Sequence, residues 1–102
     1  MSVSLQVIYP ATEGTQFDFD YYLGNHMELT RTHMGSHIDS TVITKGLAGG
    51  PGTPPPFHAV ATIVFADRAA MNAAMRSSDA LMADIPNFTD TTPQILIGEV
   101  VG

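Results

Sequence analysis

The sequence predicts an α+β fold of the split βαβ type. Four segments have the apolar content and alternation of strands, and helical segments separate them in the order β-α-β-β-α-β. The 102 residues suffice for one domain, which we place at 1–102. The third strand is apolar on both of its faces, so we expect both faces of the sheet to be covered. Together these observations favour a ferredoxin-like domain with a four-stranded antiparallel sheet.

The first strand and the first helix have clear boundaries. Apolar and polar residues alternate over 3–9, which predicts a strand, and Pro10 ends it. Residues 17–34 predict a helix, and Gly35 is a suitable terminator. At helical spacing, one face of this helix contains Phe19, Tyr22, Leu23, His26, Leu29, Thr30, His33 and Met34.

The middle of the chain predicts two strands and an irregular loop. The β-branched residues of 37–47 favour a strand, with His37 at its edge. The segment 48–56 contains too much glycine and proline for regular structure. The alternating segment 57–66 is the clearest strand of the chain.

The last third predicts a helical pair and a closing strand. Asp67 is expected to cap a helix of good helix formers. A second short helix, DALMADI, follows Ser77 or Ser78 and ends at Pro86. The final strand is PQILIGEVV at 93–101. The methionines of these helices, Met71, Met75 and Met82, fill the core or form the soft wall of an apolar site.

Composition excludes several partners. The net charge is −6 with no basic cluster, so we expect no nucleic-acid partner. No segment has the length and apolarity of a membrane span, and the start lacks the pattern of a signal peptide, so we expect no membrane association and a cytoplasmic location. The helices can cover only one apolar face of the sheet. Packing of two sheets through their other apolar faces would bury those side chains, which predicts a homodimer with a barrel-like core.

The candidate chemistry centres on the first helix. Tyr22 and His26 are four residues apart and therefore neighbours, either as a proton-transfer pair or as a hydrogen-bonded pair inside a core. His33 lies further along this face, where it completes a pocket, packs, or caps the helix. His58 either faces His26 across a pocket or faces a partner sheet. The same reasoning assigns Phe19, Leu23, Leu29 and His33 to the pocket wall.

No cofactor or metal is expected. The chain lacks cysteine, and Gly35 interrupts the histidine-containing segment before three ligands can share one helical face. No glycine-rich phosphate loop precedes a helix. A heme held by a single histidine is a less favoured alternative.

Three segments resemble the EthD family, whose name comes from the degradation of ethyl tert-butyl ether. They are FDFDYYLGNHMEL at 17–29, FHAVATIVFAD at 57–67 and DIPNFTDTTPQILIGEVV at 84–101. Glu28 stands where the family often has a proline. The resemblance implies a dimeric α+β barrel, a fold shared with cofactor-free monooxygenases, muconolactone isomerases and polyketide cyclases.

Two functions are open at this point. The first is a catabolic enzyme that binds a small apolar or aromatic molecule between helices and sheet, and isomerises, cyclises or rearranges it by proton transfer. His26 would act as acid or base, Tyr22 would orient it, and His58 would be a second group. The second is a non-catalytic binding or accessory subunit of a degradation pathway. A closed, dry cavity reached by two histidines would favour the enzyme, and a filled core with no cavity would favour the accessory role.

Overall fold

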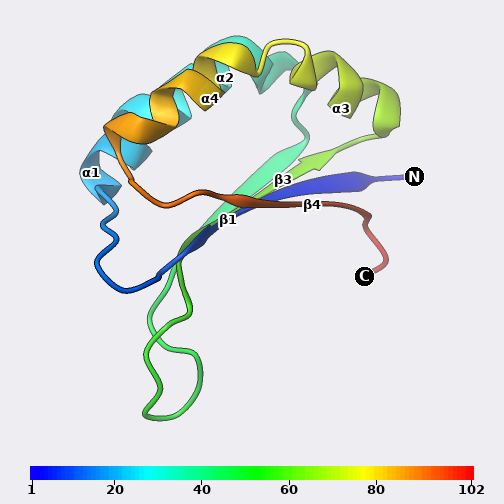
Figure 1. Cartoon of the computed structure of the whole chain (residues 1–102). Helices are drawn as coiled ribbons and strands as arrows, with labels where there is room; N and C mark the ends of the chain where they lie inside the picture. Colours follow the sequence, from blue (N-terminus) through cyan, green and yellow to red (C-terminus); the bar gives the residue numbers. More distant parts are fainter.

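A computed structural model describes all residues, 1–102, and confirms the predicted fold class. Four strands form one antiparallel sheet with the order β2-β3-β1-β4, so the first and third strands are central (Figure 1). The third strand pairs with the second, and the first pairs with the fourth. The strands are β1 (Val3–Pro10), β2 (Ser40–Lys45), β3 (Phe57–Phe65) and β4 (Gln94–Glu99).

All helices lie on one face of this sheet (Figure 1). The first is continuous but contains a π-helical turn: α1 (Phe19–Tyr21), η1 (Tyr22–His26) and α2 (Met27–Met34), followed by the 3₁₀ turn η2 (Gly35–His37). The second helical layer contains α3 (Arg68–Met75), α4 (Asp79–Asp84) and the 3₁₀ turn η3 (Ile85–Asn87). None of the helices has both the length and the apolar character needed to cross a lipid bilayer.

Local chemistry explains where the helices begin. The side chain of Asp18 accepts a hydrogen bond from the backbone N–H of Tyr21 at 3.0 Å. Asp67 accepts one from the N–H of Ala70 at 2.8 Å, which confirms the predicted cap. The predicted strand at 37–47 was too long: it begins only at Ser40, because the chain makes a 3₁₀ turn after α2 that includes His37.

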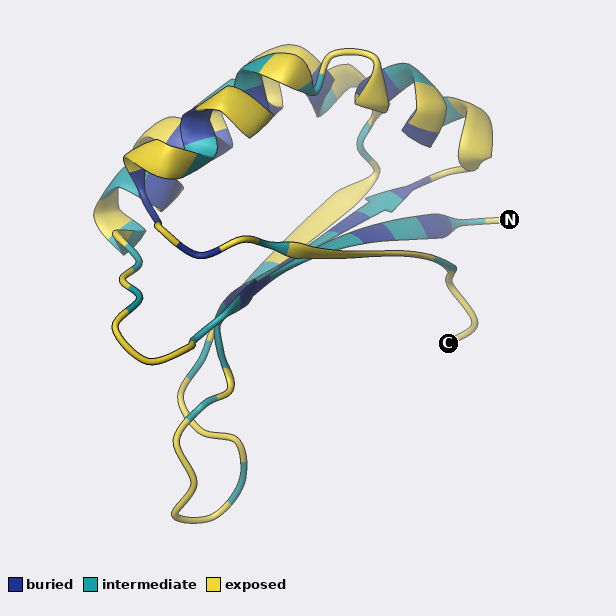
Figure 2. Ribbon diagram, viewed as in Figure 1, coloured by how far each residue is buried: buried dark blue, intermediate teal, exposed yellow.

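The central strands show which face of the sheet meets the helices. In β3, Ala59, Ala61, Ile63 and Phe65 are buried, and the residues between them are only partly covered. Figure 2 shows this alternation as bands of buried and intermediate residues along β1 and β3. The helix-facing residues form two clusters, one around Phe65 and the other around Tyr9. The site described below lies where these clusters meet.

The outermost strand β4 has little cover. Ile95, Leu96 and Ile97 are each about half exposed, at 51%, 53% and 48%. Figure 2 shows that β4 is exposed along most of its length, because the helices lie over the central strands. On the face without helices, Val42 of β2 is 61% exposed. A single chain therefore leaves apolar side chains of its sheet in contact with water.

Candidate functional site

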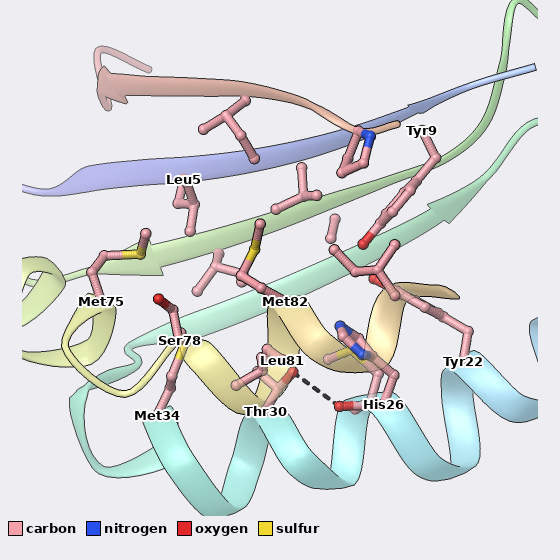
Figure 3. A pocket seen from close by; sticks show the side chains of 17 residues that line it. Leu5, Tyr9, Tyr22, His26, Thr30, Met34, Met75, Ser78, Leu81 and Met82 are labelled. Carbon is pink, nitrogen blue, oxygen red and sulfur yellow. Dashed lines mark hydrogen bonds between the residues drawn. The ribbon is translucent and has the colours of Figure 1, made fainter. Parts of the chain in front are cut away.

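A cavity of about 250 Å³ lies between the sheet and the helices. Its floor is formed by β1 and β3, and its walls by the first helix and by α4 (Figure 3). Thirteen of its 17 lining residues are hydrophobic, and none carries a formal charge apart from a protonatable histidine. The lining residues are Leu5, Val7, Tyr9, Tyr22, His26, Met27, Thr30, Met34, Ala61, Ile63, Met75, Ser78, Leu81, Met82, Ile85, Pro93 and Ile95.

His26 supplies the titratable group of this cavity. It is the last residue of the π-helical turn and only 5% exposed. Its Nδ1 lies 3.0 Å from Oδ2 of Asp84. Because an ionised carboxylate can only accept, we assign the ring proton to Nδ1. Nε2 has no partner in the protein and is not sealed off, so its lone pair is available to a molecule in the cavity.

Three donors hold the Asp84 carboxylate. The hydroxyl of Tyr21 donates to Oδ1 at 2.7 Å, and Nδ2 of Asn87 donates to the same oxygen at 3.0 Å. His26 donates to the other oxygen. Burial alone would raise the pKa of Asp84, but the hydrogen bonds from Asn87, Tyr21 and His26 outweigh burial and lower it below 3.8. Asp84 is therefore ionised at neutral pH and fixes the orientation of the imidazole.

The pKa of His26 responds to two opposing influences. Burial lowers the pKa below the ordinary 6.5, and the neighbouring Asp84 carboxylate offsets this decrease only in part. The imidazole is consequently neutral at pH 7. A neutral imidazole with Nδ1 protonated and Nε2 free has the protonation state of a general base.

Aromatic rings enclose this base. Tyr22 stacks on His26 with ring centroids 5.3 Å apart and an interplanar angle of 19°. Phe88 contacts the imidazole with centroids 4.7 Å apart. Tyr9, from β1, meets Tyr22 edge to face at 5.9 Å and also lines the cavity. Burial raises the pKa of Tyr22 to about 12. The rings of Tyr22 and Phe88 therefore restrict water around His26 and hold its imidazole in one rotamer.

Only some of the first-helix residues expected at the pocket line the cavity. Tyr22 and His26 line the cavity, as do Thr30 and Met34. The wall residues expected at Phe19, Leu23, Leu29 and His33 do not line it; Leu23 is 52% exposed and His33 is exposed. The buried stripe follows a four-residue spacing through Tyr22, His26, Thr30 and Met34 and includes Met27. It is thus rotated away from Leu29 and His33.

His58 does not reach His26. It alternates with the buried residues of β3, and its Nε2 lies 2.9 Å from the hydroxyl oxygen of Thr15. Its ring stacks on Phe17 with centroids 5.9 Å apart. It is not part of the cavity wall, so the arrangement of two histidines across one pocket is absent.

Sequence reasoning missed the most important partner of His26. Asp84 is 58 residues away in the chain, and in the sequence it reads as an ordinary acidic residue of a short helix. One signal was available: Asp84 follows Leu81 by three residues and so shares its buried face. Of the methionines, Met75 and Met82 line the cavity, whereas Met71 is in the core. No three histidine or acidic side chains gather in a way that could hold a metal ion.

Comparison with known proteins supports a family assignment. Residues 12–92 match the model of the EthD domain. An EthD-like protein from Ralstonia eutropha JMP134 is 37% identical, with a TM-score of 0.89 over 99% of this chain and 93% of that one. An ethyl tert-butyl ether degradation (EthD) family protein from Bacillus halodurans C-125 is 26% identical, with a TM-score of 0.77 over 99% and 100% of the two chains.

A more distant structure shares the fold alone. A dimeric ferredoxin-like protein from an uncultured marine organism is 12% identical, with a TM-score of 0.61 over 100% of this chain and 96% of that one. None of the curated proteins matches the chain. The family model covers most of the chain, and the Ralstonia structure matches nearly all of it at 37% identity. The chain therefore belongs to the EthD family.

Proposed function

We propose that this protein binds a small apolar or aromatic molecule in its helix–sheet cavity and moves a proton on it without a cofactor. The reaction would be an isomerisation, cyclisation or lactone rearrangement in a catabolic pathway. The observation that carries this proposal is the pairing of His26 with Asp84 at the wall of an apolar cavity. His26 is the base, and later the acid that returns the proton. Tyr22 and Asp84 position it.

The lining of the cavity supports a hydrophobic ligand. Thirteen of the 17 lining residues are hydrophobic, and the polar groups gather mainly around His26. A ligand pocket that is mostly apolar with a few placed polar groups is the usual arrangement for small-molecule sites. The cavity at His26 differs from the filled core that the accessory function would predict, but only one histidine reaches it. The catalytic proposal therefore rests on the His26–Asp84 pair in place of a second histidine.

A binding and turnover experiment tests this proposal. The fluorescence of 2-naphthol, a neutral bicyclic phenol, would report binding, and a set of neutral lactones and unsaturated ketones would be tested for isomers of unchanged mass. We expect His26→Gln to reduce turnover by at least ~10²-fold. His33→Gln, an exposed histidine outside the cavity, is the matched control and should have no effect. Binding without any turnover would favour the accessory function.

We further propose that two copies pair through their sheets. The face without helices carries Val42, 61% exposed, and Leu96, 53% exposed, together with partly covered valines of β3. Burial of such a surface against a second copy would remove it from water. A ferredoxin-like structure of the same fold is described as dimeric, which supports the pairing of two copies.

A further inference from the structure

We propose that the substrate is a neutral carbonyl compound with an acidic C–H next to the carbonyl group. In this proposal His26 Nε2 removes the proton, and Tyr9, with Tyr22 beside it, donates a hydrogen bond to the carbonyl oxygen. The inference rests on the proposed function and names the substrate class that this site would accept. Four features of the cavity carry it: its charge, its donors, its base and its size.

The lining of the cavity selects against anions. No lysine or arginine lines it, and the whole chain has only four basic residues against ten acidic ones. A carboxylate or phosphate ligand would lose its hydration in an apolar site without gaining a countercharge, which is costly. The substrate is therefore uncharged when it enters.

The phenol groups of Tyr9 and Tyr22 provide donors near the base. The rings of Tyr9 and Tyr22 lie 5.9 Å apart and those of Tyr22 and His26 5.3 Å apart, so the three groups cluster. Figure 3 shows them at one end of the cavity, with Met75 and Ser78 toward the other. Burial raises the pKa of both phenols above the ordinary 10.0, and the neighbouring Tyr22 raises that of Tyr9 further, so both keep their protons. In this proposal the carbonyl oxygen replaces Tyr22 as the acceptor of the Tyr9 hydroxyl.

A base combined with neutral hydrogen-bond donors suits the removal of a proton from the carbon next to a carbonyl group. When Nε2 takes a proton from carbon, the electron pair of the C–H bond forms a C=C bond, and the carbonyl electrons move to oxygen. The product is an enolate and an imidazolium, which Asp84 stabilises through Nδ1. Donors aimed at the developing oxyanion lower the barrier in a dry site. Return of the proton to a different carbon of the enolate completes an isomerisation with no change in composition. Exchange of the imidazolium proton with solvent before its return to the original carbon gives hydrogen exchange.

The size of the cavity limits the substrate to one or two rings. Its volume of about 250 Å³ lies below the roughly 300–1,000 Å³ of sites for drug-sized ligands. Methionines at Met75 and Met82 form part of the wall, and their unbranched side chains adapt to ligands of different outline.

Hydrogen–deuterium exchange at carbon tests the inference directly. The intact protein would be incubated with 2-tetralone, 2-indanone or phenylacetone in D₂O, and loss of the protons next to the carbonyl would be followed by NMR. We expect exchange at least ~10²-fold faster than with an equal concentration of free imidazole. Tyr9→Phe keeps the ring but removes the donor, and should slow the exchange by ~10-fold or more. His33→Gln should exchange at the wild-type rate.

A binding measurement separates the two proposals. The neutral 2-naphthol should bind, and the anionic 2-naphthoate, of similar shape, should bind at least ~10-fold more weakly. Thermal melting would show that Tyr9→Phe is folded. If 2-naphthol binds but no ketone exchanges, or if folded Tyr9→Phe exchanges as fast as wild type, the assignment of a carbonyl substrate is wrong while the apolar site stands. If 2-naphthol does not bind, both proposals fail.

Discussion

The carboxylate of Asp84 fixes the orientation of the His26 imidazole, although the two residues are far apart in the sequence. Oδ2 of Asp84 and Nδ1 of His26 lie 3.0 Å apart, although 58 residues separate them in sequence. The contact joins the first helix to α4, and it leaves Nε2 as the one ring nitrogen without a protein partner. A structural hydrogen bond thereby also selects the tautomer that a base in the cavity requires.

Replacement of Asp84 by asparagine should disturb the base without emptying the site. The negative charge of Asp84 raises the pKa of His26 and partly offsets the effect of burial. Because Asp84→Asn removes this charge, the pKa of His26 should fall further below 6.5. Loss of the fixed tautomer should reduce turnover by ~10²-fold or more. NMR titration of the histidine ring would measure the pKa. Asp79→Asn, at an exposed position of the same helix, is the control. An unchanged His26 pKa would contradict the assigned contact.

The buried histidine should make stability depend on pH. Because the pKa of His26 in the folded state lies below the 6.5 of the unfolded chain, the unfolded chain binds more protons in that interval. The free energy of unfolding should therefore fall as pH decreases from 6.5 to the folded-state pKa. Urea unfolding at several pH values would measure this slope. His26→Gln should flatten it, and a slope unchanged in this variant would assign the effect to another group.

Asp84 should affect the free energy of unfolding in a separate and more acidic range of pH. Its pKa in the folded state is lowered below 3.8, so it contributes stability above that pH and loses the contribution as pH falls through the folded-state value. Urea unfolding below pH 4 should therefore show a steeper loss in wild type than in Asp84→Asn. Equal slopes in the two proteins would show that the three hydrogen bonds do not favour the charged carboxylate.

The sequence predicts the fold well because the fold depends on local patterns. The alternation in 57–66, the Asp67 cap and the break at Gly35 each act within a few residues, and each corresponds to an observed feature. The pocket wall depends on the rotation of the first helix. Apolar residues at Leu23 and Leu29 widened the expected face, and the π-helical turn at Tyr22–His26 departs from the regular 3.6-residue period.

Contacts between segments distant in sequence explain why the rest of the site could not be predicted. The sequence marks His26 as inward-facing, but it contains no local sign that α4 brings Asp84 to Nδ1 or that β1 brings Tyr9 to the same cavity. For His58 the sequence left the direction of the side chain open, and the structure decides it. Its alternation in β3 left two faces open to it, and the structure pairs it with Thr15 at the end of the strand.

Filling the cavity should block the ligand and preserve the fold. Ala61 lies on the floor of the cavity and is 3% exposed, so the larger side chain of Ala61→Leu would occupy space that is now empty. We expect the affinity for 2-naphthol to fall by at least ~10-fold, because the ligand and the new side chain would compete for the same volume. Ala83→Leu, at an exposed position of α4, is the control. Undiminished binding to folded Ala61→Leu would place the ligand elsewhere.

A charge on the open face of the sheet should prevent pairing of two copies. Val42 pairs with Thr62 in the sheet and is 61% exposed, so Val42→Lys would place an ammonium group inside the proposed interface. Light scattering should report a dimer for wild type and a monomer for the variant. Leu23→Lys, on the exposed side of the first helix, should remain dimeric. A monomeric wild type, or a dimeric Val42→Lys, would contradict the proposed interface.

The protonation state of His26 is the property on which the proposed chemistry depends. NMR of the ring nitrogens of ¹⁵N-labelled protein at pH 7, with and without 2-naphthol, measures it directly. We predict a neutral ring with the proton on Nδ1, and an Nε2 signal that shifts when 2-naphthol is added. An imidazolium at pH 7, a proton on Nε2, or an Nε2 signal that does not respond to the bound phenol would contradict the account.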